Sequence, residues 1–480
     1  MVKRMSRGRA RLVVAMGVSV AGVAIAQPPP IPPLPPVPVP PANPITEPKR
    51  ILGKILFWDE QLSSDNTVSC GTCHLPGLAG SDPRIGRNPG PDNTLNTPDD
   101  KLGSPGVAKM DISEEYVEDP IFGFAAQVTR RNAQSVVGSG FSNNAMFWDG
   151  RAAGQFVDPE TGSTEINNGG ALESQAIGPI LSSIEMGHDG RTWPQVREKL
   201  TAARPLAHAR RIPPDMRNAI SGGKTYADLF ADAFGDSEIT ATRIAFAIAT
   251  YERTLIPNQA PIDAFIAGNA AALTPAQTQG LNIFLGPQAH CNVCHTPPVF
   301  SNHTFRNIGL RPPVEDTGRQ EVTNQPGDLG RFKTPTLRNV GLKNRFMHNG
   351  QLQTLTAVVN FYATPGNNFP QNRDPAAANI VIPLNARPAL VDFLTNALTD
   401  PRVRNEVFPF DRPLLRSEGE ACPSDIDGNG VTALNDLSIL LAHFGVASEA
   451  AYFEGDVDGD GDIDLSDLSI LLGGFGQPCS

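Results

Sequence analysis

Two short segments of the chain place two cysteines and a histidine at the spacing C-x-x-C-H. They are Cys70-Gly-Thr-Cys73-His74 and Cys291-Asn-Val-Cys294-His295. In such a turn each thiol can add to a vinyl group of a haem, while the histidine projects from the same helical face toward the iron. A disulfide within each pair, or one four-thiolate zinc site, is the alternative, but neither needs a histidine after both pairs. The spacing predicts two covalent haem c groups, with His74 and His295 as iron ligands, in a redox protein.

A second metal-binding pattern occurs twice near the C-terminus, in loops that begin 31 residues apart. Calcium needs oxygen ligands at loop positions 1, 3, 5 and 12 and a glycine at position 6. The candidate ligands are Asp425, Asp427, Asn429 and Asp436 in the first loop and Asp456, Asp458, Asp460 and Asp467 in the second. A solvated acidic tail is the alternative, but it does not explain the apolar helical stretches 437–444 and 468–475. The pattern therefore predicts a small helical module with two calcium loops.

This module, residues 421–480, resembles a type I dockerin, in which duplicated loops end in Asp rather than in the Glu of an EF-hand. Ala433 stands where the second loop has Asp464, so the first loop is expected to bind calcium less tightly. Cys422 and Cys479 bracket the duplication, and a disulfide between them would clamp its ends. The resemblance implies a cohesin-like or surface partner.

The N-terminus indicates an exported protein. Five basic residues precede an apolar stretch from Leu12 to Ala26 that ends in an A-x-A sequence, so residues 1–26 form a predicted secretory signal peptide. Residues 27–48 are rich in proline and predict an extended linker that acts as a tether. Export to the periplasm or cell surface also fits c-type haem and disulfides.

Charge is concentrated at the C-terminal end. Residues 421–480 hold eleven acidic and no basic side chains, which equals the net charge of −11 for the whole chain. The rest of the mature chain is only weakly acidic, so nothing in the composition supports nucleic-acid binding.

Helices must position the two haem motifs. Residues 240–251 and 355–362 have helical apolar patterns, and no run of alternating strands stands out. The predicted fold class is all-α: two cytochrome c-like haem domains, at residues 49–257 and 258–412, and the C-terminal module.

Several ordered motifs resemble those of the bacterial dihaem cytochrome c peroxidase family, which includes the methylamine-utilisation dihaem enzyme. They are Leu52-Gly-Lys-Ile-Leu-Phe-Trp58, Phe147-Trp-Asp-Gly-Arg151, Gln175-Ala-Ile-Gly-Pro179, Ile184-Glu-Met-Gly187, Thr334-Pro-Thr-Leu-Arg-Asn339 and Phe346-Met-His-Asn-Gly350. The similarity runs from about residue 49 to 410, with insertions in residues 80–125 and 155–172. It implies that the first haem reduces peroxide and that the second receives electrons from a small cytochrome or copper protein. Family members are often dimers, which implies a possible homodimer.

The resemblance also implies roles for particular residues. Splitting hydrogen peroxide needs a base that moves a proton from one oxygen to the other, and Glu185 matches the family's distal glutamate. Gln175 matches a distal amide that could hydrogen-bond the peroxide, and Trp148 matches the tryptophan between the two haems. Asn132 matches a ligand of an inter-haem calcium ion, with carbonyl groups near Lys343 and Arg345 as co-ligands. Without the motifs, surface, capping or core roles would be the default for these side chains.

The first haem site departs from the family pattern. Family members that need reductive activation close this haem with a distal histidine, yet the sequence has no histidine between Leu75 and Trp148. The first site is therefore predicted to be open in the oxidised protein. Met110, Met146 and His188 are the residues that could still close it.

The second haem site departs as well. Tyr362 stands where the peroxidases have an axial methionine, as in the methylamine-utilisation enzyme, so it is the predicted second ligand. Met347 is its rival, and a plain core role is the other alternative. An oxygen ligand lowers the haem potential relative to methionine. Ala289 stands where that enzyme has a tryptophan that relays charge to its protein substrate.

Three functions follow from these features. The first is an exported dihaem peroxidase that reduces hydrogen peroxide to water. The second is peroxide-dependent oxidation of a protein or organic substrate, favoured by Tyr362 and the missing histidine. The third, of another class, is a non-catalytic multihaem electron carrier, against which Glu185 and Gln175 argue.

Overall fold

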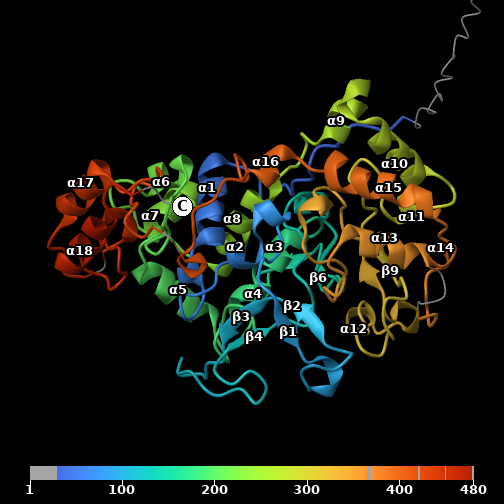
Figure 1. Ribbon diagram of the computed structural model, residues 1–480. Helices are drawn as coiled ribbons and strands as arrows, with labels where there is room; N and C mark the ends of the chain where they lie inside the picture. The colour runs from blue at the N-terminus through green and yellow to red at the C-terminus, as the bar shows by residue number, and fades with distance from the viewer. Residues whose placement is uncertain (1–29, 365–368, 420–421, 449, 478–480) are drawn as a thin grey trace, which may run out of the picture.

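The computed structural model describes residues 30–364, 369–419, 422–448 and 450–477. Figure 1 shows α1–α8 in the middle of the molecule, α9–α15 on one side and α17 and α18 on the opposite side. The predicted signal peptide lies outside the described residues. Among the described helices, none is long and apolar enough to cross a membrane.

The first haem motif lies in a helical part with one continuous apolar core. Its helices are α1 (Glu47–Trp58), α2 (Cys70–Cys73), α3 (Ala171–Ala176), α4 (Gly178–Leu181), α5 (Trp193–Ala202), α6 (Pro214–Ile220), α7 (Tyr226–Phe234) and α8 (Ala241–Thr254). Helix α8 begins after Thr240, whose hydroxyl accepts a hydrogen bond from the Arg243 N–H. Gly53 lets α1 approach α8 closely, since a Cβ there would lie 1.9 Å from the carbonyl oxygen of Ala247. The predicted helix at residues 240–251 is confirmed.

The second haem motif lies in a separate apolar core that begins at Ala260. The helices of this part are α9 (Pro261–Ile266), α10 (Pro275–Leu285), α11 (Cys291–Cys294), α12 (Gln320–Thr323), α13 (Leu355–Ala363), α14 (Pro375–Ala378), α15 (Arg387–Asp392) and a π-helix (Phe393–Ala397). Helix α16 (Pro401–Arg404) follows them and contacts the first part of the chain. Helix α13 confirms the prediction for residues 355–362. Leu255 packs in the first core and Ala260 in the second, and the division of the chain at residue 257 stays a prediction. After the second core the chain returns, and Val403 and Phe410 pack in the first core.

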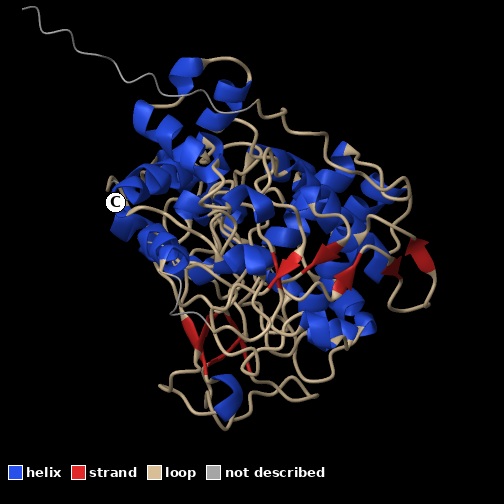
Figure 2. Cartoon of the chain, turned by 90° about the vertical axis from the view of Figure 1, so that its right-hand side faces the viewer, coloured by secondary structure: helices blue, strands red, loops and turns tan. Residues whose placement is uncertain are grey.

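The structure is mostly helical, as predicted, but it also contains short strands that were not predicted. Five two-stranded antiparallel sheets occur among the described residues. The pairs are β1 (Gly86–Asn88) with β2 (Lys101–Gly103), β3 (Pro105–Ala108) with β4 (Ala126–Val128), β5 (Ala145–Met146) with β6 (Ala152–Ala153), β7 (Phe156–Val157) with β8 (Thr164–Ile166), and β9 (Phe305–Arg306) with β10 (Phe332–Lys333). Figure 2 shows them as short pairs among loops. Strands this short carry no readable alternation.

The proline-rich segment lies against the folded body and is not a free tether. Ile31 packs on the second core, and Val37 lies close to Gly140 of the first part. Asn43 is fully buried, and its amide donates hydrogen bonds to Glu173 Oε1 at 2.7 Å and to the Phe246 carbonyl at 3.0 Å. The apolar and amide side chains of this segment bind it to both parts of the chain.

The C-terminal module contains α17 (Leu434–His443) and α18 (Leu465–Gly474) around a small apolar core of its own. It docks on the first part of the chain: Arg204 forms two 2.7 Å bonds with the Glu454 carboxylate, and the Arg210 guanidinium lies 4.2 Å from the centre of the Tyr452 ring. Cys422 is disulfide-bonded. Cys479, its predicted partner, lies outside the described residues.

Candidate functional site

The first haem motif opens on a large cavity. Cys70, Cys73 and His74 line it together. The His74 Nδ1 atom lies 3.0 Å from the Gly80 carbonyl oxygen, and this bond leaves Nε2 as the atom that can bind a metal. Burial lowers the pKa of His74, so the imidazole is neutral and keeps its lone pair. These residues fit a covalently attached haem.

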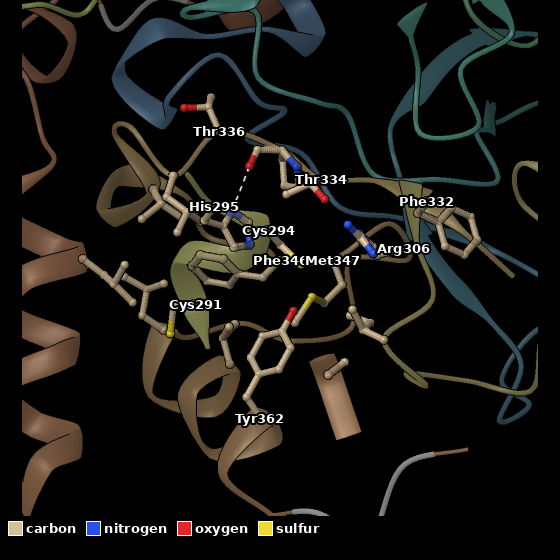
Figure 3. Close-up of a pocket in the computed structure, with 18 of the residues that line it drawn as sticks. Cys291, Cys294, His295, Arg306, Phe332, Thr334, Thr336, Phe346, Met347 and Tyr362 are labelled. Atoms are coloured by element: carbon tan, nitrogen blue, oxygen red, sulfur yellow. Dashed lines mark hydrogen bonds between the residues drawn. The ribbon is translucent and has the colours of Figure 1, made fainter. Parts of the chain in front are cut away.

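The second haem motif has the same construction. Cys291, Cys294 and His295 line another cavity, in which the His295 Nδ1 atom lies 3.1 Å from the Pro335 carbonyl oxygen (Figure 3). Burial lowers the pKa of His295 to about 4. The two cavities enclose about 1490 and 1550 Å³, parts open to solvent included.

The cysteine arrangement excludes the alternatives to haem. Cys70, Cys73, Cys291 and Cys294 are all free. The two pairs line different cavities, so they cannot form one four-thiolate zinc site.

The predicted peroxide residues meet in the first cavity. Gln175 on α3 and Glu185 in the following loop both line it with the haem motif. Burial raises the pKa of Glu185, and the Arg151 guanidinium and a hydrogen bond with Ser182 partly oppose this increase. Nothing in the local sequence singled out Arg151 or Glu252, which also line this cavity. Burial raises the pKa of Glu252 to about 8.

None of the three residues considered as possible ligands that close the first site lines this cavity. The Met146 thioether lies 3.5 Å from Lys333 Nζ, and Met110 is buried in the first core. The His188 Nδ1 atom bonds the Asp189 carbonyl at 2.9 Å, and its Nε2 lies 3.4 Å from Glu114. Met186, which sequence reasoning missed, is the methionine among the residues that line the cavity.

Trp148 and Asn132 line both cavities, so they lie between the two haem motifs. The Trp148 indole N–H donates a 2.7 Å hydrogen bond to the Asn132 carbonyl. The Asn132 amide group lies 3.5 Å from the carbonyl oxygens of Arg345 and Met347. A 180° rotation of this amide would bring a third oxygen to those two. In the observed orientation the Asn132 amide donates to these carbonyls, and the inter-haem calcium site stays a prediction.

Tyr362 and Met347 both line the second cavity. Figure 3 shows the Tyr362 hydroxyl directed toward the Met347 thioether. Both predicted ligands therefore reach the same region of the second cavity.

The predicted calcium loops bring carboxylates together in the C-terminal module. The groups are Asp425 with Asp427 and Asp436, Asp456 with Asp458 and Asp460, and Asp462 with Asp464 and Asp467. Asp467 thus clusters with two acids that were not predicted as ligands. Its carboxylate also accepts the Val457 N–H at 2.8 Å. Burial and nearby carboxylates raise the pKa of Asp456 to about 6, a repulsion that a cation would relieve.

Two half-buried haem motifs and a shared tryptophan define a dihaem redox protein with a reaction cavity at the first motif. The chain belongs to the di-haem cytochrome c peroxidase family, whose profile matches residues 47–271. It is 31% identical to the methylamine utilization protein MauG of Methylorubrum extorquens over 68% of this chain and 72% of that protein. It is 30% identical to cytochrome-c peroxidase IdrP1 of Denitromonas iodatirespirans, over 76% and 86% respectively. The protein is a peroxidase-type oxidoreductase.

A solved structure with a similar fold is that of a MauG-like protein associated with microbial copper homeostasis. It has a TM-score of 0.55 and 24% identity and covers 78% of this chain and 96% of that one. This likeness supports two cytochrome c-like domains.

Proposed function

We propose that the protein is an exported peroxidase that reduces hydrogen peroxide to water at the first haem, with electrons from a small cytochrome or copper protein entering at the second. The observation that carries this proposal is the common cavity of Gln175, Glu185 and the first haem motif, joined to the second cavity through Trp148. When bound, the haem supplies the redox-active iron at which the O–O bond is reduced.

The side chains in the first cavity would supply the proton chemistry. Glu185 accepts the proton of one peroxide oxygen and returns it to the other, which leaves as water. The Gln175 amide hydrogen-bonds the peroxide and orients it. The net reaction consumes two electrons and two protons for each peroxide and yields two water molecules. Trp148 carries the electrons between the cavities.

The first site is proposed to be open without reductive activation. Met110, Met146 and His188 contact other groups, and none lines the cavity. Met186 does line it, but this side chain is 2% exposed and packs in the first apolar core. We therefore expect the oxidised protein to show one high-spin and one low-spin haem in its EPR spectrum, and to consume peroxide at once when a reduced small cytochrome is added. Omitting the cytochrome is the control.

Other outcomes of this experiment would favour other functions. Two low-spin haems would mean that a ligand closes the first site and that activation is needed. A protein that contains both haems but does not consume peroxide would instead be a non-catalytic electron carrier.

A second candidate is peroxide-dependent oxidation of a protein or organic substrate. Tyr362 in the second cavity favours it, because an oxygen ligand would lower the haem potential. Against a protein substrate, Ala289 is buried and offers no relay at that position. Peroxide consumption driven by an organic substrate without a cytochrome would identify this function.

The C-terminal module is proposed to bind calcium and to contact a cohesin-like or surface partner. We also propose a calcium ion between the haems at Asn132, and export of the protein to the periplasm or cell surface. The three acidic clusters support the module's calcium sites.

Calcium is expected to stabilise the C-terminal module. At a concentration 100-fold above Kd, one bound ion adds about 2.7 kcal/mol to the free energy of unfolding. Calorimetric titration should lose the second-loop site in Asp458→Ala and the first-loop site in Asp427→Ala. Glu454→Gln is the matched control, because Glu454 lies outside both loops and bonds Arg204. Unchanged titration in both loop variants would contradict the calcium assignment.

A further inference from the structure

Arg151 lies at the mouth of the first cavity, in a position that no role has yet explained. Its guanidinium carbon lies 3.6 Å from the centre of the Phe147 ring, so the two groups stack. The side chain is 48% exposed, yet it lines the same cavity as Glu185 and Gln175. Arg151 is therefore in contact with both solvent and the space where peroxide would bind.

The loop that carries Arg151 is held by a residue from the second part of the chain. Phe147 has a φ of +65°, which is strained for a side chain of this size, and Gly150 has a φ of +75°, which glycine adopts readily. Arg319, from the second part of the chain, donates hydrogen bonds to the carbonyls of Asp149 at 2.9 Å and of Gly150 at 3.0 Å. A Cβ on Gly150 would lie 2.3 Å from the Arg319 Nη1 atom, so the clamp requires glycine. The second part of the chain thus fixes the loop that bears both Trp148 and Arg151.

Among the arginines around this loop, Arg151 has the weakest ion pair with a carboxylate. Asp149 lies 2.6 Å from the Arg131 Nη1 atom but 3.1 Å from that of Arg151. Arg131 also forms a two-bond pair with Asp316, at 2.8 and 2.6 Å. Arg130, the other arginine at the mouth, pairs with Glu321 at 3.1 Å. Arg151 therefore shares the Asp149 carboxylate with Arg131, which lies closer to it.

The positive charge of Arg151 reaches Glu185. Among the charged groups of the cavity, the Arg151 guanidinium is the one that stabilises the Glu185 carboxylate against burial. Glu252, the other carboxyl group in this cavity, lies on α8 and has Arg253 as the cation beside it. A partly exposed cation that lines a cavity also attracts small anions.

We propose that Arg151 is a positioning residue for the peroxide reaction and the cationic half of a site for small monovalent anions in the first cavity. This inference rests on the proposed function for the peroxide step alone. Stacking on Phe147 and the bond to Asp149 fix the guanidinium, which holds Glu185 ready to accept a proton and draws anions toward the haem motif.

Azide and fluoride titrations of the oxidised holoprotein, followed by the absorption spectrum of the first haem, test the anion site. Arg151→Gln is expected to raise the Kd of both anions about tenfold. Arg151→Lys should recover part of the affinity, because lysine keeps the charge but not the planar stack. Arg130→Gln is the matched control, since it removes an arginine from the same mouth, and its Kd should stay within about twofold of that of the unaltered protein.

Three results would overturn the proposal: no anion binding by the unaltered protein, unchanged affinity in Arg151→Gln, or an equal loss in Arg130→Gln. Haem content and circular dichroism identify a variant that fails to fold, and Arg151→Lys then carries the comparison. The anion titration needs no electron donor. If anions bind as expected but peroxide is not consumed, the proposed function fails while the anion site stands.

Discussion

Replacing Glu185 by glutamine is expected to lower peroxide turnover by about 10²- to 10⁴-fold, the usual contribution of one acid–base group. Glutamine has nearly the same shape and lines the cavity equally well, but it cannot accept and return a proton. Stopped-flow measurement of peroxide consumption with a reduced cytochrome gives the rate. The absorption spectra of both haems should be unchanged, which separates lost chemistry from lost structure.

The pH dependence of the same reaction has a defined direction. Glu185 acts as a base only when ionised, and burial raises its pKa. Activity should therefore fall as the pH drops through this pKa, and the acidic limb of the profile should disappear in Glu185→Gln. A variant that keeps both full activity and the acidic limb would contradict the role of Glu185.

Glu252 provides the matched control for Glu185. It lines the same cavity and is buried, and one of its oxygen atoms has no hydrogen-bond partner. Because burial raises the pKa of Glu252 to about 8, its carboxyl group is largely neutral at pH 7, and glutamine imitates that state. Glu252→Gln should keep most of the activity. A large loss of peroxide turnover in Glu252→Gln with a small loss in Glu185→Gln would make Glu252 the acid–base group.

Replacing Tyr362 by methionine is expected to raise the reduction potential of the second haem strongly. Axial ligands set haem potentials over a range of ~0.8 V, and a thioether favours the reduced iron more than a phenolic oxygen does. The increase should be a sizeable fraction of that range in a spectroelectrochemical titration, and the ligand-sensitive absorption bands should change with it.

Met347→Leu is the comparison that decides between the two candidate ligands. Tyr362 and Met347 reach the same region of the second cavity (Figure 3). If Tyr362 binds the iron, Met347→Leu leaves the potential nearly unchanged while Tyr362→Phe alters the spectrum. The reverse pattern would make Met347 the ligand and remove the main support for the substrate-oxidising function.

Local signals made the haem motifs, α8 and α13 predictable. The C-x-x-C-H spacing lies within one turn, and the threonine caps at Thr240 and Thr354 are adjacent to their helices. The meeting of Glu185, Gln175 and the first haem motif was predictable only through the family resemblance, because 101 residues separate Gln175 from His74. No local pattern brings such segments together.

Long-range packing explains what sequence reasoning missed. The burial of Asn43 depends on Glu173 and Phe246, which are far along the chain. The position of Arg151 depends on Arg319 from the second part of the chain. The return of Val403 and Phe410 to the first core likewise has no signal near either residue.

The position of the C-terminal module determines which face of the enzyme stays accessible when the module is bound to a partner. Arg204 and Arg210 hold the module on the first part of the chain, and Figure 1 shows the second haem part at the opposite side. A molecule anchored through α17 and α18 would present outward the end at which we propose that electrons enter. Soluble donors could then reach that end from the surrounding medium, so immobilisation and turnover would use separate faces of one molecule.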